Sequence, residues 1–133
     1  MMTQILVVDD SPTIHRMVKA ALGALPPPIE FIEAASGLDA IERLALGVVD
    51  LIVLDLNMPD MHGLEVIGFV RAHQKYRQVP IMVVTTRGDD QSRQAALQAG
   101  ANIYMTKPFA PQGLAREAAA LLAPLAGQGA SRA

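Results

Sequence analysis

Short aliphatic runs alternate along the chain with longer stretches whose apolar residues recur every three or four positions. The run Leu51–Leu54 is entirely apolar, leads directly into Asp55, and is soon followed by Pro59. A continuous aliphatic run of this length, bounded by turn residues, is typical of a strand buried on both faces of a parallel sheet. The range 29–34 starts to alternate and then breaks the pattern, so we expect it to be a half-exposed or edge strand. The remaining strands are predicted at 4–8, 81–86 and 102–106.

A helical pattern follows each predicted strand. After the first one, Ser11 suits the N-cap and Pro12 the first helical position, and Pro26–Pro28 form a rigid loop that ends this helix. The other helices are predicted at 37–46, 63–73, 89–99 and 111–125. Five strand–helix units in alternation predict an α/β fold, a doubly wound five-stranded parallel sheet flanked by five helices.

The size of the chain, 133 residues, suits a single hydrophobic core, so we assign residues 1–126 to one domain and 127–133 to a short disordered tail. The net charge of -2 gives no electrostatic reason to expect nucleic acid or an anionic membrane as a partner. Cysteine is absent, which excludes disulfides and thiolate chemistry. Neither a signal peptide nor an apolar run of roughly 18 residues is present, which predicts a soluble cytoplasmic protein without membrane insertion.

Polar residues stand where four of the predicted strands end. Asp9 and Asp10 follow the first strand, Asp55 follows the third, Thr85 closes the fourth, and Lys107 follows the fifth. Because the carboxyl ends of parallel strands lie along one edge of the sheet, where ligands bind in open α/β folds, these side chains should converge. The sequence therefore predicts a functional site at this edge.

The chemistry of these residues points to phosphoryl transfer. Three neighbouring carboxylates repel one another, and Mg²⁺ relieves this because it prefers one or two carboxylates and leaves room for a phosphate oxygen. Asp55 is the best candidate nucleophile for an aspartyl phosphate, while Asp10, with Asp9 behind it, holds the metal. Lys107 offsets charge on the transferring group.

The combined pattern resembles the receiver domain of two-component response regulators of the CheY-like single-domain type, whose fold is flavodoxin-like. The resemblance extends from about Ile5 to Leu125. It rests on Asp9-Asp10-Ser11-Pro12, on Leu54 to Pro59 with Gly63, on Thr85-Thr86, and on Lys107-Pro108-Phe109.

The resemblance implies a role for each of the acidic residues. Asp55 would be the phosphoacceptor, and the direct Mg²⁺ ligands would be Asp10, Asp55 and the backbone carbonyl of Asn57. Asp9 would assist the metal through water. The simpler interpretation of Asp9 is that it only caps the following helix.

The resemblance also implies a conformational switch. Thr85 would move toward the phosphoryl group, Tyr104 would change rotamer with it, and Lys107 would contact the phosphoryl group. The peptide bond between Lys107 and Pro108 would be cis. Alternatively, Thr85 merely ends a strand and Tyr104 is half-buried packing.

The sequence departs from the family's pattern at the fourth strand. Thr86 is bulkier than the residue many members have, which leaves the dephosphorylation rate open, and Arg87 either reaches the phosphoryl group or faces solvent. Asp89 and Asp90 give the next helix an acidic start, which argues against the flagellar-switch contact surface of chemotaxis members. The histidines share no metal-ligand spacing, so we expect ordinary surface or loop residues at His15, His62 and His73.

The favoured function is a stand-alone response regulator. It would accept a phosphoryl group from a histidine kinase or phosphotransfer protein and bind an unidentified output protein, with chemotaxis as one candidate pathway. Self-phosphorylation and self-dephosphorylation would be its only enzymatic properties. Three alternatives stay open: a small aspartyl-phosphate phosphatase suggested by Asp55-x-Asn57, a flavodoxin-like nucleotide or flavin binder, and a receiver fold that binds partners without phosphorylation.

Overall fold

The computed structural model describes residues 2–127 and contains one five-stranded sheet with all strands parallel, in the order β2-β1-β3-β4-β5. The strands are β1 Thr3–Val8, β2 Ile29–Ala34, β3 Leu51–Leu54, β4 Ile81–Thr85 and β5 Ile103–Thr106. The helices are α1 Pro12–Leu22, α2 Gly37–Leu46, α3 Gly63–Ala72, α4 Asp90–Ala99 and α5 Pro111–Gly127. The predicted fold class and element order are confirmed.

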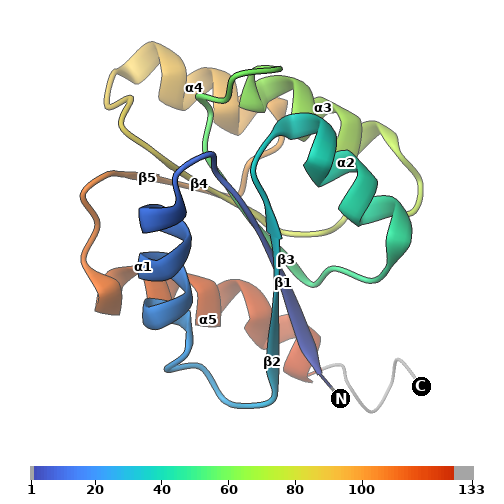
Figure 1. Cartoon of the computed structure of the whole chain (residues 1–133), viewed down its shortest axis with the longest axis vertical. Coiled ribbons are helices and arrows are strands. Elements are labelled where there is room, and N and C mark those ends of the chain that lie inside the picture. The colour runs from blue at the N-terminus through green and yellow to red at the C-terminus, as the bar shows by residue number, and fades with distance from the viewer. Residues whose placement is uncertain (1, 128–133) are drawn as a thin grey trace.

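Helices cover both faces of the sheet, with α1 and α5 on one side and α2, α3 and α4 on the other (Figure 1). The side chains of β3 divide between the two resulting cores. Leu51 and Val53 pack with residues of α1 and α5, whereas Ile52 and Leu54 pack with residues of α2, α3 and α4. This explains why β3 is apolar at every position, since both of its faces are covered.

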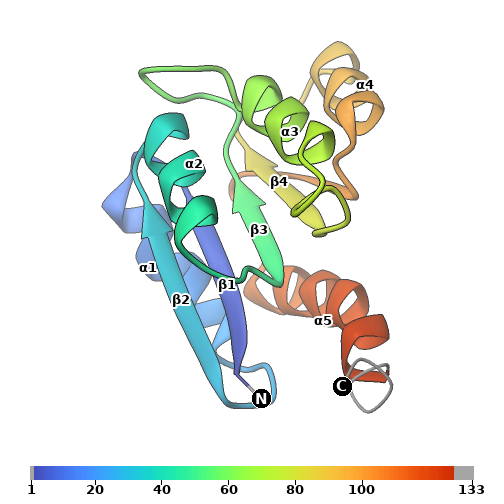
Figure 2. The ribbon, with the colours of Figure 1, turned by 90° about the vertical axis from the view of Figure 1, so that its right-hand side faces the viewer.

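Strand β2 lies at the edge of the sheet and pairs only with β1 (Figure 2). Of its six residues only Ala34 is fully buried, whereas Glu30 and Glu33 are exposed. The broken hydrophobic alternation of this strand therefore predicted its place correctly. The charged side chains also make the open edge a poor template for pairing with another chain.

Predicted cap residues stand at the starts of α1 and α4 and at the end of α4. The Ser11 hydroxyl accepts a hydrogen bond from the Ile14 N–H at the start of α1, and the Asp89 carboxylate accepts one from the Ser92 N–H at the start of α4. Helix α4 ends at Ala99, and its C-cap Gly100 has a φ of 124°, which lies in the region that favours glycine.

Most boundaries differ from the prediction by a residue or two, but the predicted end of the first helix is wrong: α1 ends at Leu22 with Gly23 as its C-cap, before Pro26–Pro28 are reached. β4 ends at Thr85, α3 ends at Ala72, and β5 starts at Ile103. Helix α5 extends through Gly127, one residue into the predicted tail; the rest of that tail, residues 128–133, lies outside the described residues. Within the described part of the chain, no helix combines the length and hydropathy needed to cross a bilayer.

Candidate functional site

Backbone hydrogen bonds between neighbouring strands continue past the strand ends and hold the backbone of the site residues in place. The Asp55 N–H donates to the Val8 carbonyl at 3.0 Å, and the Asp9 N–H donates to the Ala34 carbonyl at 3.1 Å. On the other side of the site, the Lys107 N–H donates to the Thr85 carbonyl at 2.8 Å. The ends of β1, β3, β4 and β5 are thus brought to one edge of the sheet, as parallel pairing requires.

The three predicted acidic residues form a cluster at this edge. Asp9, Asp10 and Asp55 each offer a carboxylate oxygen, and these oxygens lie within 4.8 Å of one another. Asp9 and Asp55 are only 3% and 5% exposed, whereas Asp10 is open to solvent. The buried Oδ1 of Asp55 has no hydrogen-bond partner among the described residues, a costly arrangement for a carboxylate. An all-oxygen donor set with one unpartnered oxygen and one solvent-facing acid fits a hard cation such as Mg²⁺.

Lys107 partly compensates the negative charge of this cluster. Its Nζ donates to Oδ2 of Asp9 at 2.8 Å and lies 3.5 Å from Oδ2 of Asp55. The Lys107 side chain is 13% exposed, so these ion pairs are only weakly screened by water. One ammonium facing three carboxylates leaves the site with an excess of negative charge. The Lys107–Pro108 bond is cis, as the resemblance implied.

The start of α3 lies directly against the end of β3, and this close approach requires glycine. The Gly63 N–H donates to the Leu56 carbonyl at 2.9 Å. A Cβ at Gly63 would come within 2.7 Å of both the Asp55 carbonyl oxygen and the Leu56 Cα. The loop of residues 56–62 is therefore closed at its base, where the chain returns from Leu56 to Gly63 next to the site.

The predicted switch residues lie on the opposite side of the site. Thr85 is fully buried, and its hydroxyl accepts from the Arg87 N–H at 3.4 Å. Tyr104 is partly buried and donates its hydroxyl proton to the Arg87 carbonyl. Burial, reinforced by the Asp89 carboxylate, raises the pKa of the Tyr104 phenol. Thr86 is exposed, so its bulk points away from the core.

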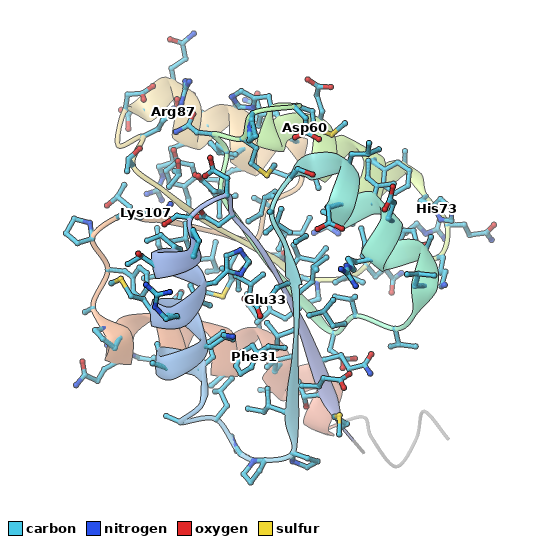
Figure 3. All side chains as sticks on the ribbon, in the orientation of Figure 1. Phe31, Glu33, Asp60, His73, Arg87 and Lys107 are labelled. Atoms are coloured by element: carbon cyan, nitrogen blue, oxygen red, sulfur yellow. The ribbon has the colours of Figure 1, made fainter. Side chains whose placement is uncertain are left out.

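Arg87 and Asn57 join the two loops that flank the site. Nε of Arg87 donates to Oδ1 of Asn57 at 2.8 Å, which links the β4–α4 loop to the β3–α3 loop. The sequence left open whether Arg87 would face solvent or the phosphoryl position. Arg87 is exposed and lies in the loop just before α4, with its guanidinium bound to Asn57 (Figure 3).

One expectation about the histidines is wrong. His15 is only 7% exposed, and its Nε2 lies 2.6 Å from the Asp9 carbonyl while its Nδ1 lies 3.0 Å from Oε1 of Glu33 on β2. The ring is buried because this face of α1 packs over the sheet, and its spacing of three and seven from Val18 and Leu22 was the signal available in the sequence. His62 caps α3 and His73 is exposed at its far end.

Known proteins match almost the whole chain. The family described as response regulator receiver domain matches residues 5–119. A chemotaxis protein CheY homolog of Campylobacter jejuni is 40% identical over 129 residues, which span 96% of this chain and 98% of that protein. The structure of chemotaxis response regulator CheY4 of Vibrio cholerae matches with 33% identity and a TM-score of 0.81, covering 92% of this chain and 100% of that one. The Mn²⁺-bound form of response regulator Rcp1 is 27% identical with a TM-score of 0.76, covering 90% and 91%.

Sequence, fold and site geometry agree with one another. The family match runs from β1 into α5 and includes every strand end that contributes to the acidic cluster. The five-stranded parallel sheet with its five helices is also the flavodoxin-like CheY fold that the resemblance implied. This chain belongs to the response regulator receiver domain family.

Proposed function

We propose that this chain is a phosphorylation switch that accepts a phosphoryl group on the carboxylate of Asp55. The observation that carries the proposal is the buried Oδ1 of Asp55, which has no protein hydrogen-bond partner among the described residues although it lies inside an acidic cluster. A carboxylate in this state is available both as a metal ligand and as a nucleophile.

The metal site is proposed to consist of Asp10, Asp55 and the backbone carbonyl of Asn57, with Asp9 assisting. Mg²⁺ bound there would supply positive charge to the oxygens of the transferring phosphoryl group. The chemistry of the donor set supports this, as does the Mn²⁺-bound form of the similar response regulator Rcp1. Burial of Asp9 and Asp55 lowers the local dielectric and strengthens the attraction for a cation.

In the proposed transfer, a carboxylate oxygen of Asp55 attacks the phosphorus of a phosphohistidine on a kinase or phosphotransfer protein. An oxygen–phosphorus bond forms, the phosphorus–nitrogen bond breaks, and the released imidazole keeps the electron pair and takes up a proton. Lys107, 3.5 Å from Oδ2 of Asp55, is placed to neutralise a phosphoryl oxygen. The same residues would support self-phosphorylation from small donors and self-dephosphorylation by water.

The switch is proposed to run from Thr85 to Tyr104. A phosphoryl group adds roughly -1.5 to -2 units of charge, and the Thr85 hydroxyl can donate to it after leaving the Arg87 N–H. The Arg87 N–H is hydrogen-bonded to the Thr85 hydroxyl and the Arg87 carbonyl to the Tyr104 hydroxyl. Movement of the loop at Arg87 would therefore change the positions of the Thr85 and Tyr104 side chains together. The surface that a partner recognises would change as a result.

The proposed output is binding of another protein, with a histidine kinase or phosphotransfer protein as the phosphoryl donor. Receiver domains of this kind are signalling domains rather than conventional enzymes. The names of the similar proteins from Campylobacter jejuni and Vibrio cholerae favour chemotaxis as the pathway. The cytoplasm is the location that we propose. The acidic start of α4 keeps the identity of the output partner open.

Mass spectrometry of the intact protein tests the proposal. Incubation with Mg²⁺ and a small acyl-phosphate donor should add one phosphoryl group, and a metal chelator should prevent it. The variant Asp55→Asn should remain unmodified, whereas Asp90→Asn, which changes an exposed acid of α4, should be modified like the wild type. An unmodified wild-type mass at high donor concentration would contradict the proposal.

A further inference from the structure

The carboxylate of Asp60, in the loop between β3 and α3, is exposed to solvent and lies against the start of α2 (Figure 3). Its Oδ1 accepts from the Gly37 N–H at 3.0 Å, and its Oδ2 accepts from the Leu38 N–H at 2.8 Å. The N–H of Met61 also donates to Oδ1 at 2.9 Å. A side chain from one loop therefore binds the first two backbone N–H groups of a helix more than twenty residues earlier.

Helix α2 does not need Asp60 in order to be capped. Its own N-cap, Ser36, accepts from the Asp39 N–H at 3.1 Å. Asp60 adds acceptors for two N–H groups that Ser36 does not reach, and its negative charge faces the positive end of the helix dipole. These hydrogen bonds, those from Leu38 and Gly37 foremost, lower the pKa of Asp60, so the carboxylate is ionised at neutral pH.

A second contact holds the same loop against α2. A Cβ at Gly37 would lie 2.2 Å from Cγ and 2.6 Å from Sδ of Met61, so the loop packs on the helix without room for a side chain. The loop is thus fixed at two places. Its base is closed by the hydrogen bond from Gly63 to Leu56, and its tip is bound to α2 through Asp60 and Met61.

We propose that Asp60 is a positioning residue for the metal site, and this inference rests on the proposed function. Asn57, whose carbonyl is the proposed third ligand, lies between the two fixed places of the loop. Without Asp60 the tip loses its polar bonds to α2, and the loop then has to be ordered when the metal binds. This ordering cost weakens metal binding, because a preorganised ligand loses less entropy.

Isothermal titration calorimetry with MgCl₂ measures this effect directly, without any phosphoryl donor. We expect Asp60→Ala to raise the Kd for Mg²⁺ by roughly tenfold, in the range found when groups that orient metal ligands are removed. Asp60→Asn, which keeps the shape and one carbonyl acceptor, should give an intermediate Kd. The matched control is Ser36→Ala, which removes a cap of the same helix without touching the loop and should leave the Kd unchanged.

The rate of self-phosphorylation separates positioning from a general loss of structure. At limiting Mg²⁺ the Asp60 variants should be slower than wild type, and at saturating Mg²⁺ their rates should return close to it. The inference is overturned if Ser36→Ala weakens Mg²⁺ binding as much as the Asp60 variants do, or if Asp60→Asn binds Mg²⁺ like the wild type. A wild type that binds no Mg²⁺ would instead overturn the proposed metal site itself.

Discussion

Replacing Gly63 by alanine has two opposite effects on stability: a gain in helix propensity and a steric clash. Gly63 is the first residue of α3, and alanine in a helix is more stable than glycine by about 0.5–1 kcal/mol. A prediction from helix propensity alone is therefore that the variant gains stability. In the structure, however, the new Cβ would lie 2.7 Å from two backbone atoms, the Asp55 carbonyl oxygen and the Leu56 Cα.

The steric effect should win. Ordinary contacts of a Cβ begin near 3.4 Å, so α3 and the end of β3 have to separate by about 0.7 Å. Neither atom belongs to a flexible side chain, and overpacking of this kind costs about 1–3 kcal/mol. After the gain in propensity, we expect a net loss of about 1–2 kcal/mol in the free energy of unfolding. Because the displaced carbonyl belongs to Asp55, phosphorylation should slow by about tenfold or more.

Urea unfolding of Gly63→Ala beside Gly68→Ala tests this reasoning. Gly68 lies in the same helix and is exposed, and an added Cβ there would meet no atom within 4 Å, so alanine should add about 0.5–1 kcal/mol of stability. We expect the free energy of unfolding to fall in Gly63→Ala and to rise in Gly68→Ala. If Gly63→Ala is as stable as Gly68→Ala and is phosphorylated at the wild-type rate, the close approach does not matter and the reasoning is wrong.

Three further results are expected. Lys107→Met leaves the buried Asp9 without its ammonium, so the metal-free protein should lose up to about 3 kcal/mol of stability in urea unfolding, and Mg²⁺ should restore part of it. Equal urea midpoints for the metal-free wild type and Lys107→Met would contradict this. Comparing alkaline absorbance titrations of the wild type and Tyr104→Phe isolates the Tyr104 phenol, which should ionise above its ordinary pKa. The stability that depends on the neutral phenol should disappear as the pH rises through that raised pKa. Arg87→Ala removes the bridge to Asn57 and should shorten the phosphoryl lifetime by roughly threefold to tenfold, measured as decay of the labelled protein; an unchanged lifetime would show that the bridge plays no part.

The parts of the fold that follow from local patterns were predictable. The apolar run of β3 indicated burial on both faces, and the broken alternation of β2 indicated an edge. The convergence of Asp9, Asp55 and Lys107 followed as well, since parallel strands place their carboxyl ends together whatever the loops do.

Contacts between loops were not predictable, because they depend on backbone paths that no local pattern encodes. The bond from Arg87 to Asn57 joins residues 30 apart in the chain, and that from Gly37 to Asp60 joins residues 23 apart. Nothing in the sequence distinguishes Asp60 from the turn residues that commonly follow a strand. The spacing of His15 from Val18 and Leu22 signalled its burial, but its contact with Glu33 of the edge strand likewise required knowing how α1 packs on the sheet.

Chemical mapping of the phosphorylated residue tests the central claim most directly. Borohydride reduces an aspartyl phosphate to homoserine, which peptide mass spectrometry assigns to a single position after treatment with Mg²⁺ and an acyl-phosphate donor. We expect homoserine at position 55, with none when the donor or the metal is left out. Homoserine at another aspartate, or none in a protein that binds Mg²⁺, would contradict the claim that Asp55 is the phosphoacceptor.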